Sequence, residues 1–147
     1  MKIYLASPFF KEEEIKVYNK VIKNLRRQGL DVFVPREHEI PNGWDIENER
    51  WAECVFAVDY VAIEQSDIVV VLNFGMYSDS GTAWECGYAY AKGKRVINVL
   101  CGNKETEYSL MMLNGTNTVI PLADFENTLF NSILTMGKEL NKTVEQK

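Results

Sequence analysis

The sequence predicts a single α/β domain, residues 1–147, built on a five-stranded parallel sheet with helices on both faces. Apolar runs of strand length alternate along the chain with longer segments whose apolar residues recur at helical spacing. The connections between these segments are short, which favours parallel strands joined by helical crossovers. The length suits one domain with its own core and is too small for two.

The first half of the chain supplies two strands and two helices. We expect the strands at residues 2–6 and 31–35, and the helices at about 11–28 and 45–65. The first helix repeats apolar residues at helical spacing and ends at Gly29. The polar loop 36–43 separates the second strand from the second helix. The expected apolar stripe of that second helix consists of Trp51, Val55, Val58 and Ala62.

The second half supplies three strands, two helices and a short apolar turn. The strands are expected at 67–72, 95–100 and 117–122, the helices at about 81–92 and 124–140, and the turn at 108–113. The polar tail 141–147 is expected to fray. Five such strands suit the flavodoxin-like order 2-1-3-4-5. That order brings the loop after the first strand, the loop after the third and the start of the third helix to one crevice.

Charge and hydropathy exclude several classes of protein. The formal net charge of −5 leaves no basic footprint for nucleic acid. No apolar run approaches the roughly 20 residues of a membrane helix, so we expect no membrane partner. Because a strand pattern follows Met1 directly, we expect no signal peptide and a cytoplasmic location.

Cysteine and histidine usage argues against a metal site. The three cysteines are odd in number and widely spaced, which is typical of reduced thiols in the cytosol. No cysteine pair has zinc-ligand spacing, and His38 is the only histidine. We therefore expect no bound metal.

The segment Asp79–Ala89, read DSGTAWECGYA, opens the third helix at the ligand-binding end of the predicted sheet. Its carboxylates, Asp79 and Glu85, lie six residues apart. Glu85 fits two interpretations equally well. It completes a capping box with Thr82, or it is a carboxylate kept ionised by the helix dipole and able to attack an anomeric carbon. Asp79 likewise fits an N-cap position before Gly81 as well as a place in a site.

Asp59 and two adjacent aromatic residues are further candidates. Asp59 lies in the second helix between positions expected to be buried, where a carboxylate is costly unless it has a partner or a function. An ion pair or a cap is the alternative explanation for it. Phe9 and Phe10 follow the first strand, where they either cover the end of the sheet or flank a flat nucleobase or sugar.

Tyr4 alternates with Ile3 and Leu5, so it faces the opposite side of the sheet and needs a hydrogen-bond partner if it is buried.

The sequence lacks the motifs of several other kinds of site. The glycines of the third loop and helix form neither a GxGxxG nor a Walker loop, which argues against dinucleotide or ATP binding. No GxSxG motif supports serine hydrolysis.

Three of these segments together resemble nucleoside 2-deoxyribosyltransferases. They are Tyr4–Phe10, the Asp59-xxx-Ile63 crossover and Asp79–Ala89, and the D-x-G-T-A-x-E-x-G-x-A pattern of the last is the specific part. The likeness runs from the first strand to about residue 122. It implies a flavodoxin-like fold and transfer of 2-deoxyribose from a 2′-deoxynucleoside to a free nucleobase, without an added cofactor. It also implies a homo-oligomer built from dimers, in some members a hexamer.

The resemblance assigns roles to four residues of the reacting centre. The family's nucleophilic glutamate falls on Glu85 and the tyrosine that positions it on Tyr4. The aspartate that handles the base falls on Asp79, and the aspartate of the second helix on Asp59.

The resemblance also assigns substrate contacts. These fall on Phe9, Phe10, Gly81, and on Ser109 to Met111, the segment with which a neighbouring subunit closes the site.

Two positions of this chain differ from several bacterial relatives. Glu39 stands where those carry glutamine, so base preference is expected to differ, because an ionised carboxylate accepts but does not donate. Ser109 stands where they carry asparagine, which is longer and contacts the 5′-hydroxyl.

Two other functions stay open from the sequence. One is a hydrolase of nucleoside 5′-monophosphates, with Ser7 and Ser80 as candidate phosphate contacts but no cation obviously beside them. The other is a non-catalytic nucleotide-binding module, which the three carboxylates disfavour. The choice between purines and pyrimidines, the tolerance of ribonucleosides and the number of subunits do not follow from the residues.

Overall fold

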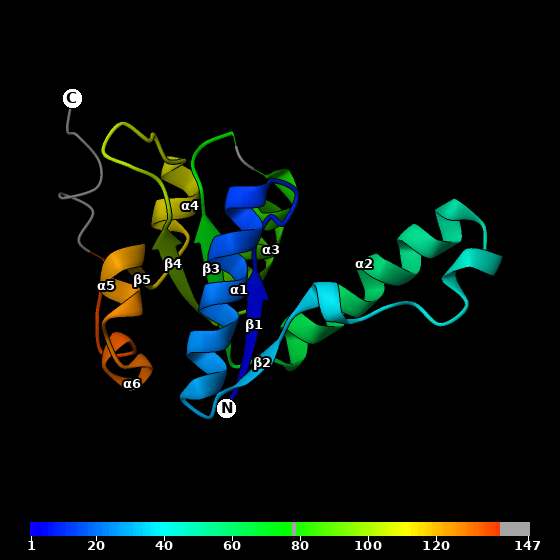
Figure 1. Cartoon of the computed structure of the whole chain (residues 1–147), viewed down its shortest axis with the longest axis horizontal. Helices are drawn as coiled ribbons and strands as arrows, with labels where there is room; N and C mark the ends of the chain where they lie inside the picture. The colour runs from blue at the N-terminus through cyan, green and yellow to red at the C-terminus, as the bar shows by residue number, and fades with distance from the viewer. Residues whose placement is uncertain (78, 139–147) are drawn as a thin grey trace.

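A computed structural model describes residues 1–77 and 79–138 and contains a five-stranded sheet in the order β2-β1-β3-β4-β5 (Figure 1). All neighbouring strands are parallel, so the predicted topology is confirmed. The strands are β1 (Lys2–Ala6), β2 (Asp31–Phe33), β3 (Ile68–Asn73), β4 (Arg95–Leu100) and β5 (Thr118–Pro121). β2 is shorter than predicted because Pro35 begins the 3₁₀ turn η1 (Pro35–Glu37).

Helices cover both faces of the sheet (Figure 1). They are α1 (Glu12–Arg27), α2 (Asn48–Gln65), α3 (Ser80–Ala91), α4 (Leu110–Asn114), α5 (Leu122–Glu126) and α6 (Phe130–Ile133). One face packs against α1, α5 and α6, and the other against α2 and α3. Among the described residues, none of these helices combines the length and the apolar character needed to cross a membrane.

Strand alternation decides which residues face which helices. Ile3 and Leu5 belong to the core under α1, whereas Tyr4 and Ala6 belong to the core under α2 and α3. The prediction that Tyr4 faces the opposite side is therefore confirmed. Every residue of the central strand β3 is buried, as expected for a strand covered on both faces.

Helix α2 differs from the prediction in its packing, because its first half projects beyond the sheet (Figure 1). Of its predicted apolar stripe only Ala62 is buried, and the Trp51 side chain is 46% exposed. Val55 and Val58 are half-buried. The helix begins at Asn48, after the separate 3₁₀ turn η2 (Gly43–Asp45), and not at residue 45. Because no sheet lies beneath the first half of the helix, Val55 and Val58 line a cavity and Trp51 is partly exposed to solvent.

The predicted helix 124–140 is also wrong. Two short helices, α5 and α6, replace it, and Leu129 between them is 70% exposed. The side chains of Asn127 and Thr128 donate to the carbonyls of Ala123 and Asp124, which competes with continued helix formation. The rest of that prediction, residues 139–140, and the predicted tail 141–147 lie outside the described residues.

Candidate active site

One cavity of about 240 Å³ lies at the carboxyl end of the sheet, where the predicted switch point brings α2, α3 and the loop after β1 together. It gathers the predicted carboxylates Asp59, Asp79 and Glu85, together with the predicted Phe9, Phe10 and Gly81. Its described lining consists of Ser7, Phe9, Phe10, Pro35, His38, Ile40, Val55, Val58, Asp59, Asp79, Gly81 and Glu85.

Tyr4 and Glu85 are joined by a hydrogen bond in which the phenol O–H donates to a carboxylate oxygen. Tyr4 is fully buried in β1, pairs in register with Phe33 and Val69, and stacks on the Phe33 ring at 5.6 Å. A buried ring locked in this way gives the Glu85 carboxylate a fixed orientation. The partner that the sequence required for a buried Tyr4 is therefore Glu85.

The first turn of α3 explains why Glu85 is free for this contact. Asp79 is the N-cap, and its carboxylate accepts from the backbone N–H of Thr82 at 2.8 Å and of Gly81 at 3.4 Å. The Thr82 hydroxyl donates to the same carboxylate at 2.5 Å. The N-cap interpretation of Asp79 is confirmed, and the capping box between Thr82 and Glu85 is wrong. Because the helix begins at Ser80, Glu85 lies in its second turn.

Burial controls the charge of Glu85 and Asp59. Burial raises the pKa of Glu85 to about 7, which the Tyr4 hydrogen bond opposes and the nearby Asp59 and Asp79 reinforce. Burial likewise raises the pKa of Asp59 to about 6, and the His38 charge opposes it. The expectation that Glu85 stays ionised is therefore only partly met, because with a pKa of about 7 part of its population is protonated at neutral pH.

The pKa of Tyr4 lies well above its ordinary value, first because the phenol is buried and then because Glu85 is beside it. Tyr4 thus keeps its proton at every pH at which the protein works. It serves Glu85 as a constant hydrogen-bond donor.

The aromatic wall of the cavity is held by a buried glutamate. The Glu14 carboxylate accepts from the backbone N–H groups of Phe10, at 3.2 Å, and Lys11, at 2.9 Å. Phe9 stacks between two rings, at 5.0 Å from Phe10 and 5.9 Å from Tyr18. Phe10 remains 71% exposed, which leaves a free aromatic surface beside the cavity.

Several lining residues were missed by sequence reasoning. Pro35, His38 and Ile40 come from the segment after β2, which reads as an ordinary polar loop. Val55 and Val58 were assigned to the core of the protein. His38, as the only histidine, was the one available signal, since histidine changes charge near neutral pH.

Three predicted substrate contacts do not line this cavity within one chain. Glu39 is exposed next to His38. The Ser109 hydroxyl caps α4 by accepting from the Met112 N–H at 3.4 Å, and Met111 is 83% exposed. Ser109 and Met111 therefore reach a site only if they act on another subunit.

Two further hollows lie nearby. An aromatic cleft of about 450 Å³ between α2 and α3 shares Val55, Asp59, Gly81 and Glu85 with the cavity. Its remaining walls are Trp51, Ala52, Phe56, Tyr60 and Trp84. A larger hollow of about 680 Å³ lies by the start of α1 and contains none of the predicted site residues. Within residues 1–77 and 79–138, no group of three histidine, cysteine, aspartate or glutamate side chains is arranged to hold a metal ion.

Comparison with known proteins points to one family. The family model described as nucleoside 2-deoxyribosyltransferase matches residues 3–136. A nucleoside deoxyribosyltransferase of Lactobacillus johnsonii is 27% identical over 108 residues, which cover 73% of this chain and 69% of that protein.

Solved structures agree with this family. The 2-deoxyribosyltransferase of the psychrotolerant bacterium Bacillus psychrosaccharolyticus is 35% identical, with a TM-score of 0.76 over 90% of this chain and 96% of that one. A CMP N-glycosidase of Clostridium botulinum is 22% identical, with a TM-score of 0.59 over 86% of this chain and 96% of that one. At that identity the second likeness shows the fold alone.

Proposed function

Because the chain belongs to the nucleoside 2-deoxyribosyltransferase family and is an enzyme of that class, we propose that Glu85 carries the deoxyribosyl group between nucleobases as a covalent intermediate. The observation that supports this most strongly is the Glu85 carboxylate itself. It lines a cavity, is oriented by a buried phenol and is kept out of the helix cap by Asp79.

In the first half of the reaction the ionised Glu85 carboxylate attacks C1′ of a 2′-deoxynucleoside. The C1′–N bond breaks, its electron pair goes to the base, and an ester forms between C1′ and Glu85. The missing 2′-hydroxyl makes the oxocarbenium-like transition state easier to reach, which favours deoxynucleosides. The Tyr4 O–H stabilises the negative charge on Glu85 before attack and orients the oxygen that attacks.

Asp59 is the carboxyl best suited to give the departing base its proton. Its pKa of about 6 leaves a protonated population near neutral pH. Asp79, the first candidate by resemblance, already accepts three hydrogen bonds from the start of α3. We assign Asp79 to holding that helix start, and Asp59 to proton transfer with the base.

In the second half an acceptor base enters from the face that the first base left. Its ring nitrogen attacks C1′, Glu85 leaves, and the proton of the acceptor returns to Asp59. Two displacements at C1′ retain the configuration, and the kinetics are ping-pong. Water in place of the acceptor gives slow hydrolysis.

A nucleoside 5′-monophosphate is a poorer substrate for this cavity. None of the described residues that line it is lysine or arginine, while three of them are carboxylates. A phosphate would meet repulsion from these carboxylates there, with no lysine or arginine in the described lining to offset it. Hydrolysis of a nucleoside 5′-monophosphate at its N-glycosidic bond, which the sequence also allows, is the alternative to deoxyribosyl transfer. Comparing a deoxynucleoside with its 5′-monophosphate as substrate separates the two.

The exposed apolar surface supports a homo-oligomer built from dimers. Trp51, Phe56 and Trp84 are about half exposed on the aromatic cleft beside Glu85, and Trp44 in the turn η2 is fully exposed. Surfaces of this kind are typical of subunit contacts. Light scattering after gel filtration is expected to give at least a dimer, and a monomer at working concentration would contradict this proposal.

The activity is tested by incubating the enzyme with deoxyinosine and adenine and separating the products by chromatography. Wild type is expected to form deoxyadenosine and hypoxanthine. Glu85→Ala is expected to form neither while keeping the native circular dichroism spectrum. Near-normal exchange by that variant would rule the scheme out.

A further inference from the structure

Among the described residues that line the cavity, His38 is the one that carries polar ring atoms and that the proposed mechanism leaves unused. Its imidazole stacks on the Phe33 ring at 4.1 Å between centroids and 9° between planes. Phe33 in turn stacks on Tyr4. Three near-parallel rings thus connect His38 to the tyrosine that holds Glu85.

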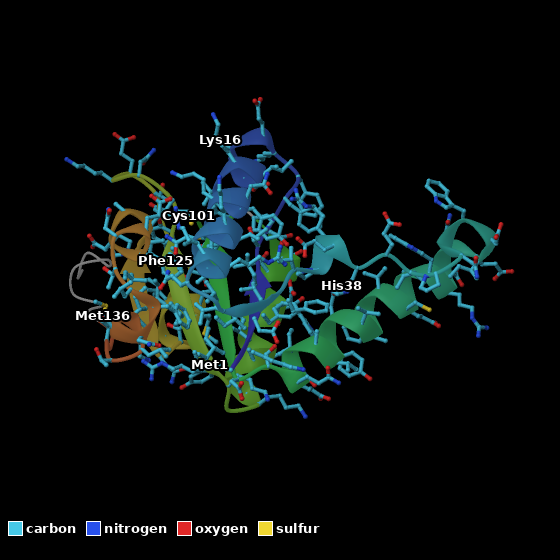
Figure 2. All side chains as sticks on the ribbon, turned by 60° about the horizontal axis from the view of Figure 1, so that its bottom comes forward. Met1, Lys16, His38, Cys101, Phe125 and Met136 are labelled. Atoms are coloured by element: carbon cyan, nitrogen blue, oxygen red, sulfur yellow. The ribbon has the colours of Figure 1, made fainter. Side chains whose placement is uncertain are left out.

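The backbone beneath His38 is also fixed. The His38 N–H donates to the Pro35 carbonyl at 3.1 Å and closes the η1 turn. Both carboxylate oxygens of Glu37 accept from the Arg26 guanidinium, at 2.6 and 2.7 Å, which ties this turn to α1. The imidazole therefore stands at the junction between the sheet and the projecting part of α2 before any ligand arrives (Figure 2).

Asp59 lies within electrostatic reach of this ring. The charge of His38 lowers the pKa of the Asp59 carboxyl against the effect of burial. Both side chains line the same cavity as Phe9 and Phe10, although one comes from the segment after β2 and the other from α2. A base that receives a proton from Asp59 therefore lies in the same cavity as His38.

We propose that His38 is a specificity-determining residue of the nucleobase site, in which a ring nitrogen hydrogen-bonds the edge of the base that exchanges a proton with Asp59. A neutral imidazole offers one N–H donor and one acceptor nitrogen. It therefore complements an amino or an oxo substituent through the appropriate tautomer, whereas an ionised carboxylate such as Glu39 complements only the amino group. The proposal rests on the transfer function above, but its test does not require turnover.

The direct test uses the fact that the chain has a single histidine. Its imidazole C–H resonances are recorded by NMR while free adenine is added without any deoxynucleoside, so that no reaction takes place. Adenine is expected to shift or broaden these resonances, and 2-deoxyribose at the same concentrations is expected to leave them unchanged. The His38→Gln variant, which lacks the signals, confirms their assignment.

Steady-state kinetics supply the second test. The His38→Phe variant keeps a ring that stacks on Phe33 but lacks both nitrogens, so KM for adenine is expected to rise about tenfold with a smaller change in kcat. The His38→Gln variant keeps a donor and an acceptor and is expected to restore most of this loss. Equal KM values for wild type and His38→Phe, or His38 resonances that ignore adenine, would overturn the proposal. Adenine-dependent shifts in an enzyme that makes no deoxyadenosine would support the contact and refute only the transfer function.

Discussion

The Tyr4 hydroxyl donates a hydrogen bond to the Glu85 carboxylate, although the two residues are 81 positions apart in the chain. One lies in the middle of a buried strand and the other in the second turn of a helix packed on that strand. The sequence alone allows Glu85 equally well as part of a helix cap. The hydrogen bond to Tyr4 instead directs its carboxylate at the cavity.

Tyr4→Phe removes this donor and keeps the ring. Because the Tyr4 hydrogen bond lowers the pKa of Glu85, its loss raises that pKa. The higher pKa of the Glu85–Asp59 pair sets the alkaline limb of the rate profile, so this limb moves to higher pH. We expect kcat to fall about 10- to 100-fold, since the nucleophile loses both orientation and ionisation. The measurement is kcat against pH for both proteins. An alkaline limb that stays in place in the variant would contradict this role.

The wild-type rate should depend on pH in two directions. The reactive form has Glu85 ionised and Asp59 protonated, so the pair holds one proton between them. With a pKa of about 7 for Glu85 and about 6 for Asp59, the rate is expected to peak between these values. It falls at lower pH because both groups are protonated and at higher pH because both are ionised. A rate that rises steadily to pH 9 would count against Asp59 as the acid.

Glu85→Gln should stabilise the protein at alkaline pH. The pKa of Glu85 is raised from 4.5 to about 7, so its contribution to stability is full below about 4.5 and lost as the pH rises through 7. Glutamine has no such ionisation, and its amide oxygen still accepts from Tyr4. We expect its advantage in unfolding free energy to grow by roughly 1–3 kcal/mol from pH 5 to pH 8. Urea unfolding of both proteins at pH 5 and pH 8 measures this difference in unfolding free energy. The same difference at both pH values would refute the prediction.

Asp79 and Asp59 should respond differently to loss of charge. Asp79→Ala removes the N-cap of α3 and is expected to cost about 1 kcal/mol of stability, whereas Asp79→Asn keeps a capping oxygen and most of that stability. Asp59→Asn is expected to lower kcat about 100-fold through loss of the proton donor. Thermal unfolding and kcat are compared for the three variants. A larger loss of kcat in Asp79→Asn than in Asp59→Asn would reverse the two assignments.

The strands, their order and the side on which Tyr4 lies follow from the sequence, because a period of two and short crossovers leave few alternatives. The role of Glu85 does not follow in the same way. Thr82 and Glu85 have capping-box spacing, and only the Asp79 side chain and the approach of β1 decide between the two roles. Helical spacing likewise marks the stripe on α2 without showing that its outer half has no sheet to cover.

The composition of the loop that carries His38 does not mark it as part of the site, and only the resemblance to relatives did so, through Glu39. Nothing in its polar composition indicates that the segment after β2 returns to the edge of the cavity. The ring stack with Phe33 is a tertiary contact between a strand and a loop, which no local pattern encodes. The resemblance to relatives drew attention to Glu39, the neighbouring residue, because it differs from them.

The central claim is that Glu85 becomes covalently bound to the sugar, and mass spectrometry tests it directly. The enzyme is mixed with a 2′-deoxynucleoside in the absence of acceptor base, quenched in acid within the first turnover and digested. The peptide that contains Glu85 is expected to gain the mass of one deoxyribosyl group, which adenine added before the quench removes as deoxyadenosine. Exchange of bases at the normal rate with no modified peptide at any time, or with the sugar on another residue, would contradict the mechanism.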